Sequence, residues 1–472
     1  MKERCVVRFF LCEVRAGRLL NRMTTLKKRA VHAGLWTIAG DATSQVLRLG
    51  SNLILTRLLF PSMFGVMAIV NTIMIGLVLF TDLGLRENVI QSHRGDDPVF
   101  LNTVWSIQIL RGIVLWLLSV LCSFGLYVVV RNGWVSPHTV YADPMLPFLI
   151  PVSTLAVLFS GFEPTWTSIA SRRLQQFKIT LIDLSSQLGS LVVMLVWVWL
   201  DRSIWALVAG GLSGSVIRNI LVYYVFPGET NRWQLEREAV HEILHFGKWM
   251  FMASIVGFLF KNGDRLLLGG LISAQELGVY TVAFLLVNTL SHSVNRLVGN
   301  VAFPALSESR RERPAQLRQV YYRFRLLFDS GLLFFAGFFY VTGEWIIHLL
   351  YDSRYHEAGH IMEILALLLV AVRYNLADQC FIVLGKPKYM TYLIAVRTTT
   401  MFLLLPWAYR HYQLTGAIWA VVASYFVSIP VTLYFKYKSH LLHIGRELLT
   451  LPILAVGAIA GEIFLKVISG WR

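Results

Sequence analysis

Residues Arg57–Val70 read RLLFPSMFGVMAIV, and residues Leu266–Ala283 read LLLGGLISAQELGVYTVA. Each stretch predicts two apolar helices that meet at a tight turn containing Pro or Gly. Phe64-Gly65-Val66 in the first stretch has its counterpart in Leu277-Gly278-Val279 in the second, far along the chain. The same turn made twice indicates that the chain repeats one helical unit.

The composition of the chain is that of a membrane protein. Of its 472 residues, 56% are hydrophobic and only 15% are charged, and the mean hydropathy is +0.59. A soluble domain keeps about 25% charged residues. The apolar residues lie in blocks of about 20 or more, which is the length of a helix that crosses a bilayer. We therefore expect an all-α polytopic membrane protein.

The apolar blocks predict thirteen membrane spans joined by short loops. The longest loop, at residues 227–244, is charged and amphipathic, and it separates the first six spans from the next six. The predicted spans are residues 31–58, 63–90, 100–130, 145–171, 176–200, 203–226, 245–272, 275–305, 318–343, 358–384, 388–409, 413–436 and 448–468.

Lys and Arg predict the direction in which the spans run. Of the 43 Lys and Arg residues, 28 fall in the N-terminal tail and in loops on the same side as that tail, whereas six fall on the other side. Loops in the cytoplasm are the ones enriched in Lys and Arg. The N-terminus is therefore predicted to be cytoplasmic. The C-terminus lies outside if residues 448–468 span the membrane, and inside if they only lie on its surface.

The segment 1–22 does not form a good signal peptide, because Arg8 and Glu13 interrupt the apolar run and no small-residue cleavage site follows. Met23 is therefore an alternative start to Met1. The cysteines match no zinc or redox motif and are expected to be free thiols. They are Cys5, Cys12, Cys122 and Cys380.

Two further similarities support the repeat. Ile204-Trp205-Ala206 recurs as Ile418-Trp419-Ala420, and Arg172-Arg173 corresponds to Lys386-Pro387, both at nearly the same offset as the turn. Because each copy holds an even number of spans, both copies point the same way, and transporters with such parallel repeats bind substrate near the midplane between the halves. We predict two parallel-repeat six-helix bundles around a central cavity, plus a 13th helix. The predicted units are a basic cytoplasmic tail at 1–30, an N-terminal bundle at 31–226, a cytoplasmic amphipathic linker at 227–244, a C-terminal bundle at 245–437 and an extra C-terminal helix at 438–472.

The chain resembles a known transporter family in two pairs of segments. They are LILTRLLFPSMFGVMAIV (Leu53–Val70) followed by FTDLGLRENVIQ (Phe80–Gln91), and NGDRLLLGGLISAQELGVYTVA (Asn262–Ala283) followed by VAFPAL (Val301–Leu306). These segments are similar to the polysaccharide transporter branch of the multidrug/oligosaccharidyl-lipid/polysaccharide exporter superfamily, the Wzx-like lipid-linked oligosaccharide flippases. The likeness covers about residues 30–437.

The resemblance implies two six-helix bundles arranged in a V around a central cavity, in the bacterial cytoplasmic (inner) membrane. It also implies that the chain moves a polyprenyl-diphosphate-linked oligosaccharide out of the cytoplasmic leaflet by alternating access. Such a substrate serves exopolysaccharide, O-antigen or capsule biosynthesis, and a glycan polymerase and export machinery are further candidate partners.

Polar residues inside the predicted spans are the candidate substrate site. The offset that relates Gly65 to Gly278 also relates Arg48 to Lys261, and Asn52 to Arg265. A charge at mid-membrane costs at least ~2.5–3.5 kcal/mol, so such residues face a partner or a wet cavity. The first span carries a polar stripe whose members follow one another at intervals of about one helical turn, which places them on one helical face. The stripe consists of Asp41, Gln45, Arg48 and Asn52.

The substrate that the resemblance implies explains why basic residues would lie in the cavity. A diphosphate is negatively charged where lipid meets sugar, and Arg and Lys in a wet cleft replace its hydration with charge-assisted hydrogen bonds. An open alternative is that Lys261 or Arg265 forms a structural ion pair with Asp264. The expected residues that bind the diphosphate-sugar head are Arg48, Lys261, Arg265, Arg296, Asn52 and Gln45.

Carboxylates provide candidate gates. Asp82 lies near the cytoplasmic end of the second span, and a bridge from Asp82 to Arg296 would hold the cytoplasmic side shut. The alternative for Asp82 is a local pair with Arg86, one turn along. The repeat also relates Asp183 to Arg397, so a pair across the halves is a further candidate. The expected gating or ion-pair residues are Asp82, Asp264 and Asp41.

Other functions fit the sequence less well. A drug or small-molecule exporter of the same superfamily would favour acidic residues in the cavity, whereas cations outnumber carboxylates within these spans. A membrane polysaccharide polymerase or ligase would carry its catalytic residues on a large outward loop. Here the outward loops are short, and the cluster at residues 348–357 holds the best catalytic candidates. The Lys and Arg residues that give the net charge of +16 lie in short loops between spans, which argues against a nucleic-acid-binding protein.

No cofactor is predicted. A Walker-type loop is absent from the sequence, so the chain is not expected to use ATP directly. His241 and His245 stand one helical turn apart, but no further ligand completes a metal site. We therefore expect a transporter rather than an enzyme.

Overall fold

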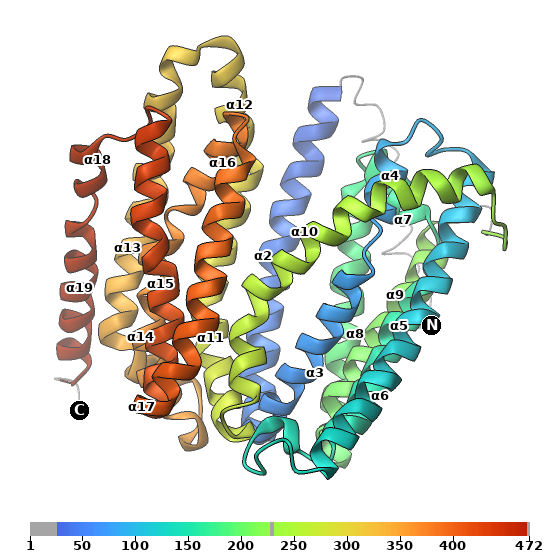
Figure 1. The fold of residues 1–472 in the computed structure, drawn as a ribbon, viewed down its shortest axis with the longest axis horizontal. Coiled ribbons are helices and arrows are strands. Elements are labelled where there is room, and N and C mark those ends of the chain that lie inside the picture. Colours follow the sequence, from blue (N-terminus) through green and yellow to red (C-terminus); the bar gives the residue numbers. More distant parts are fainter. Residues whose placement is uncertain (1–25, 227–230, 470–472) are drawn as a thin grey trace, which may run out of the picture.

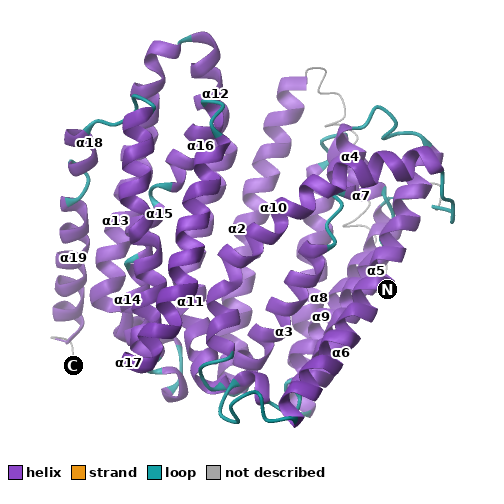
Figure 2. Cartoon of the chain, in the orientation of Figure 1, coloured by secondary structure: helices purple, strands orange, loops and turns teal. Residues whose placement is uncertain are grey.

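The computed structural model describes residues 26–226 and 231–469. These residues are helical apart from turns and loops, and no strand occurs among them (Figure 2). Some predictions fall outside the described residues. They concern the tail at 1–25, the start at Met1 or Met23, the thiols of Cys5 and Cys12, residues 227–230 of the linker and the side chain of His245. Cys122 and Cys380 are free thiols, as predicted.

The helices follow the predicted spans in order along the chain. Those of the N-terminal half are α2 (Leu26–Leu58), α3 (Pro61–Phe80), α4 (Leu85–Gln91), α5 (Pro98–Arg131), α6 (Leu146–Gly161), α7 (Trp166–Arg172), α8 (Gln176–Leu200) and α9 (Trp205–Val225). Those of the C-terminal half are α10 (Arg237–Gly269), α11 (Ala274–Leu297), α12 (Phe303–Glu312), α13 (Leu317–Leu350), α14 (Ala358–Ala366), α15 (Leu368–Val372), α16 (Asn375–Val383), α17 (Pro387–Lys438), α18 (Ile444–Leu448) and α19 (Pro452–Ser469).

The number of candidate spans is lower than the thirteen predicted. Within the described residues, nine helices are long and apolar enough to cross a membrane, or ten if the bent pair α6 and α7 counts as one span. The 52-residue helix α17 holds two predicted spans, and its backbone breaks at Gln413. Helices α2 and α10 are each 33 residues long and are not among these candidate spans. The chain is an all-helical polytopic membrane protein.

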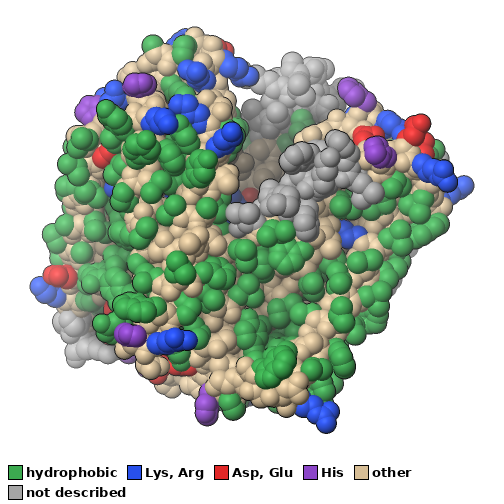
Figure 3. Space-filling model, viewed as in Figure 1, with side chains coloured by type: hydrophobic (Ala, Val, Ile, Leu, Met, Phe, Trp, Pro, Cys, Tyr) green, Lys and Arg blue, Asp and Glu red, His purple; other side chains and the backbone are tan. Residues whose placement is uncertain are grey.

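The two halves of the chain lie side by side and separate toward one end (Figure 1). We call the end with the α2–α3 and α10–α11 turns the turn end, and the end with α4, α7, α12 and α18 the basic end. Across the halves, α3 packs on α11 and on α10. Hydrophobic side chains cover the middle of the visible face, while Lys and Arg gather toward its ends, and the surface is hollowed between the halves near the basic end (Figure 3).

The repeated turn is the place where the two halves meet most closely. A Cβ atom added to Gly65 would lie 1.8 Å from the carbonyl oxygen of Ala274, and one added to Gly278 would lie 1.8 Å from that of Pro61. Helix backbones approach so closely only through small residues. Pro61 begins α3 and Ser273 caps α11 through a capping box, so the crossing joins the first turns of both helices.

Polar contacts close the turn end further. The Tyr351 hydroxyl donates to Oδ1 of Asn52 at 3.0 Å. The Arg354 guanidinium donates to the carbonyl oxygens of Thr56 at 3.2 Å and Arg57 at 3.1 Å. Because these contacts join the end of α2 to the segment after α13, the halves are tied together at the turn end.

The C-terminal segment is anchored by buried charges. Glu447 of α18 forms ion pairs with Arg325 of α13 at 2.5 Å and with Lys436 of α17, and the side chains of both cations are at most 1% exposed. Helix α19 runs along α13, where a Cβ atom added to Gly337 would lie 2.1 Å from the carbonyl oxygen of Leu454. Helices α18 and α19 together also count among the candidate spans.

We predict that Gly65→Ala destabilises the fold, because the new Cβ atom forces α3 and α11 apart. Overpacking costs typically about 1–3 kcal/mol, which outweighs the gain of up to about 1 kcal/mol that Ala brings to a helix over Gly. Thermal unfolding in detergent should show a lower midpoint for Gly65→Ala. Gly50→Ala on α2 is the matched control, since a Cβ atom there meets nothing within 4 Å; equal midpoints for the two variants would contradict the close crossing.

We predict that Glu447→Gln lowers the free energy of unfolding by about 3–5 kcal/mol, because breaking a buried ion pair leaves Arg325 and Lys436 without full compensation. Glu462→Gln is the control, because this carboxylate is exposed on α19. Denaturant or thermal unfolding in detergent measures both variants. If Glu447→Gln were as stable as Glu462→Gln, the buried pair would not anchor the segment.

Candidate functional site

Three of the predicted cations come together from both halves of the chain. Arg48 of α2, Lys261 of α10 and Arg296 of α11 are exposed although each lies within a predicted span. All three lie near His292 of α11, and Arg48 and Arg296 lie near each other. The sequence prediction did not include His292, which precedes Arg296 by one helical turn and therefore shares its helical face. This spacing of one helical turn from Arg296 is the sequence signal that could have identified His292.

Lys261 and Arg265 have no carboxylate partner within the described part of the chain. The predicted alternative, a structural pair with Asp264, is wrong, because the buried Asp264 carboxylate accepts a hydrogen bond from the Tyr280 hydroxyl at 2.6 Å. The Arg265 guanidinium lies 5.0 Å from the centre of the Phe284 ring. Its buried Nε atom has no hydrogen-bond partner among the described residues. Both cations are therefore available to an anion.

The polar stripe of α2 is only partly available. The Arg48 guanidinium donates to the side-chain oxygen of Gln45, and no described carboxylate pairs with it. Asn52 is already engaged, since it accepts the hydrogen bond from Tyr351 at the turn end. Arg48 and Gln45 therefore remain candidates for the substrate site, whereas Asn52 takes part in closing the turn end.

Arg296 pairs with Asp41 rather than with Asp82. The Arg296 Nη1 atom lies 2.8 Å from Oδ1 of Asp41, which joins α11 to α2 across the halves. Asp82 instead accepts a hydrogen bond from the backbone N–H of Gly84 at 3.0 Å. The predicted Asp82–Arg296 bridge is therefore wrong in this conformation, because the chain after α3 turns Asp82 into the N-terminal half.

A cavity of about 510 Å³ lies inside the N-terminal half and is lined by Asp82 together with acidic and basic residues of other helices. Within it, Arg218 of α9 forms ion pairs with Glu163 at 2.8 Å and with Asp183. The predicted pair of Asp183 with Arg397 does not form, because Arg397 donates to Ser428 at 2.7 Å inside the C-terminal half. These carboxylates therefore neutralise cations within their own half.

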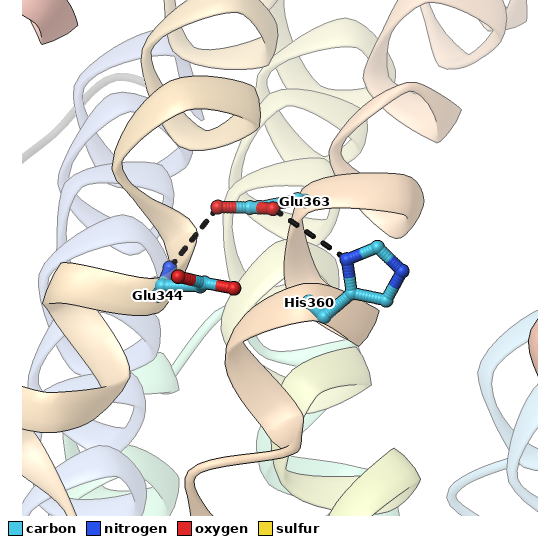
Figure 4. Close-up of side chains that lie close together, drawn as sticks. All are labelled: Glu344, His360 and Glu363. Carbon is cyan, nitrogen blue, oxygen red and sulfur yellow. Dashed lines mark hydrogen bonds and ion pairs between the residues drawn. The ribbon is translucent and has the colours of Figure 1, made fainter.

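Three possible metal ligands meet on α13 and α14, although residue spacing predicts none. The donor atoms of Glu344, His360 and Glu363 lie within 4.8 Å of one another (Figure 4). Glu363 accepts a hydrogen bond from the backbone N–H of Glu344 at 3.3 Å and lies 3.8 Å from Nδ1 of His360. Glu344 and His360 are exposed, and all three lie on other helices than the cationic residues. The group is thus separate from the candidate substrate site.

The best catalytic candidates of the outward loops are also engaged with one another. Asp352 binds Arg354, and the rings of His348 and His356 are stacked with their centres 3.8 Å apart. Arg354 in turn holds the end of α2. These contacts give the segment a structural role at the turn end.

Comparison with known proteins places these features in a family. A model of the family described as "Polysaccharide biosynthesis protein" matches residues 54–360. Lipopolysaccharide biosynthesis protein WzxC of Escherichia coli (strain K12) is 21% identical over 457 residues, covering 93% of this chain and 88% of the relative. Teichuronic acid biosynthesis protein TuaB of Bacillus subtilis (strain 168) is 22% identical over 235 residues, covering 49% of this chain and 46% of the relative.

Solved structures share the fold of the chain. The lipid II flippase MurJ in an inward closed conformation has a TM-score of 0.69 at 13% identity, covering 92% of each chain. A multidrug resistance MATE family transporter of the MOP superfamily in an inward-facing conformation has a TM-score of 0.64 at 13% identity, covering 84% of this chain and 95% of the transporter. At this identity the likeness concerns the fold alone.

Proposed function

Because the chain belongs to the polysaccharide biosynthesis protein family and has the fold of MOP-superfamily transporters, we propose that it is a flippase for a polyprenyl-diphosphate-linked oligosaccharide. It moves this substrate across the bacterial cytoplasmic membrane for exopolysaccharide, O-antigen or capsule biosynthesis. The observation that carries the proposal is the set of cations without carboxylate partners among the described residues, Arg48, Lys261 and Arg265, on helices of both halves.

The energy of these cations supports an anionic substrate. A charge at the centre of a span costs at least ~2.5–3.5 kcal/mol. The chain compensates other charges, such as Arg218 and Arg325, with carboxylates of the same half. Within the described residues, Arg48, Lys261 and Arg265 lack such compensation. A diphosphate would supply the missing negative charge through charge-assisted hydrogen bonds, which Arg can make in pairs.

The proposed mechanism is alternating access between two parallel-repeat six-helix bundles. By the distribution of Lys and Arg, the basic end and the N-terminus face the cytoplasm. The present conformation is then the one that admits the diphosphate-sugar head from the cytoplasm, while the polyprenyl tail stays in lipid between the halves. Asp41 holds Arg296 until the diphosphate competes for it, and the release of the turn end opens the other side.

The alternatives explain less. If the chain were a drug or small-molecule exporter of the same superfamily, the cations around His292 would have no evident function. A polymerase or ligase would need free catalytic side chains in the outward loops, whereas Asp352, Arg354, His348 and His356 are held in structural contacts. Glycan polymerase and export machinery remain candidate partners of the proposed flippase, because they would consume its product.

We predict that Arg48→Ala and Lys261→Ala each abolish glycan export while the protein remains in the membrane, and that Arg48→Lys retains part of it. The reason is that each cation supplies charge-assisted hydrogen bonds worth about 1.5–3 kcal/mol. The measurement is a leaflet assay in a deletion strain, which reports the side of the membrane on which polyprenyl-diphosphate oligosaccharide accumulates. Arg131→Ala, an exposed cation at the end of α5, is the control and should restore export.

Two outcomes would overturn this proposal. Full export by the Arg48→Ala/Lys261→Ala double variant would remove these residues from the mechanism. Accumulation of the substrate on the outer face of the deletion strain would mean that the lipid crosses without this protein, and would favour the polymerase or ligase.

We predict that reversing one charge of the Asp41–Arg296 pair slows export and that reversing both restores part of the rate. A partly exposed pair contributes about 0.2–1 kcal/mol, so loss of the attraction alone shifts the balance of conformations by up to about fivefold. Export rates of Arg296→Asp, Asp41→Arg and the double variant test this coupling. A double variant no faster than Arg296→Asp would show that Arg296 acts through the substrate and not through Asp41.

A further inference from the structure

A second cavity of about 540 Å³ opens between the start of α13 and the junction of α18 with α19. It lies at the basic end, on the outer side of the C-terminal half and far along the chain from the α2 cations (Figure 1). Its lining combines cations, hydrogen-bond donors and apolar side chains. The polar residues that matter are Arg323, Arg325, Arg446, Gln319, Tyr322 and Thr450.

The cavity carries a surplus of positive charge. At its floor, Arg325 is bound to Asp329 at 3.0 Å and to Glu447 at 2.5 Å. These two carboxylates are shared with further cations, since Arg373 lies 3.5 Å from Asp329 and Lys436 binds Glu447. Neither carboxylate is therefore left to neutralise the residues at the mouth.

Two exposed arginines stand at that mouth. Arg323 makes no hydrogen bond or ion pair with another described residue. Arg446 lies 5.5 Å from the centre of the Tyr322 ring, so an aromatic contact orients it without neutralising its charge. The Tyr322 hydroxyl is itself used by Glu447, at 2.9 Å. The positively charged donors of the mouth are thus the two guanidinium groups.

Large exposed apolar side chains lie at and beside the cationic mouth, and two of them, Leu326 and Leu449, line the cavity itself. Leu326 and Leu327 on α13 are 49% and 67% exposed, and Leu448 and Leu449 at the end of α18 are 56% and 66% exposed. Because α13 and the α18–α19 segment both count among the candidate spans, these leucines mark the level at which hydrocarbon begins. Guanidinium groups directly above exposed leucines match the headgroup and the acyl chains of one lipid.

We propose that this cavity binds the headgroup phosphate of an anionic phospholipid, with the acyl chains lying on the exposed leucines. Basic pockets between membrane helices on the cytoplasmic side are suited to anionic headgroups, and the forked donors of Arg fit phosphate oxygens. The lipid bridges Arg323 of α13 and Arg446 of α18. It therefore helps the ion pairs of Glu447 to anchor the C-terminal segment. This inference is independent of the proposed flippase activity.

Intact-mass spectrometry of the detergent-solubilised full chain, titrated with phosphatidylglycerol or phosphatidylcholine, tests the site. We expect the wild type to retain phosphatidylglycerol, and Arg323→Gln/Arg446→Gln to bind it roughly thirtyfold more weakly, since each of the two basic residues near the headgroup strengthens binding about fivefold. Arg310→Gln/Arg311→Gln is the matched control, because it removes two exposed cations of α12 at the same end that do not line the cavity.

A stability measurement completes the test. Without anionic lipid, both double variants should melt at the wild-type temperature, because the altered side chains are exposed. Phosphatidylglycerol should raise the melting temperature of the wild type and of the control, but not that of Arg323→Gln/Arg446→Gln.

Four results would overturn the proposal. The first is that the two double variants bind phosphatidylglycerol equally well, and the second is that the wild type binds phosphatidylcholine as well as phosphatidylglycerol. The third is that glycerol phosphate protects the wild type against melting as strongly as phosphatidylglycerol does. The fourth is that the wild type retains polyprenyl phosphate in preference to phosphatidylglycerol. The third would make the cavity a site for soluble phosphate, and the fourth would make it part of a substrate path.

Discussion

The arrangement of the two halves depends on the backbone contact between α3 and α11. With Gly65 and Gly278 packed against the carbonyl groups of Ala274 and Pro61, no side chain separates the first turns of these helices. From this crossing the two halves separate toward the basic end (Figure 1). The surface is hollowed between the halves near the basic end (Figure 3). Arg48, Lys261 and Arg296 are exposed on helices of both halves.

The cations within the spans have different partners, and the partner indicates the role. Arg325 and Arg218 bind carboxylates of their own half, as structural charges do when they are removed from water. Arg296 binds Asp41 across the halves, which suits a contact that forms and breaks as the halves move. Lys261 and Arg265 have no carboxylate among the described residues. Under the proposed function, this last group is the one that receives the anionic substrate.

The sequence predicted what depends on periodicity and on the repeat. Apolar blocks gave the order of the helices, and the offset between Arg48 and Lys261 identified cations that the fold brings near each other. Contacts that depend on side-chain direction could not be predicted in this way. Asp82 lies close in sequence to the end of α3, yet the chain turns it away from Arg296; Tyr280 reaches Asp264 from another helix. No spacing rule indicates these partners, because the first depends on how the chain turns after α3 and the second on how the consecutive helices α10 and α11 pack.

The strengths of the contacts at the two ends decide which movement a bound anion can drive. The Asp41–Arg296 pair is partly exposed, at 35% and 45%, and such pairs contribute about 0.2–1 kcal/mol. The turn end buries apolar side chains such as Leu277 and Val66 beside the glycine crossing, and each such side chain contributes about 1.5–3 kcal/mol. Under the proposed function, a diphosphate held by hydrogen bonds of about 1.5–3 kcal/mol each exceeds the ion pair but not the packing of the whole turn end. Substrate binding alone can therefore rearrange the basic end, whereas opening the turn end requires new contacts between the halves at the basic end that replace the packing lost.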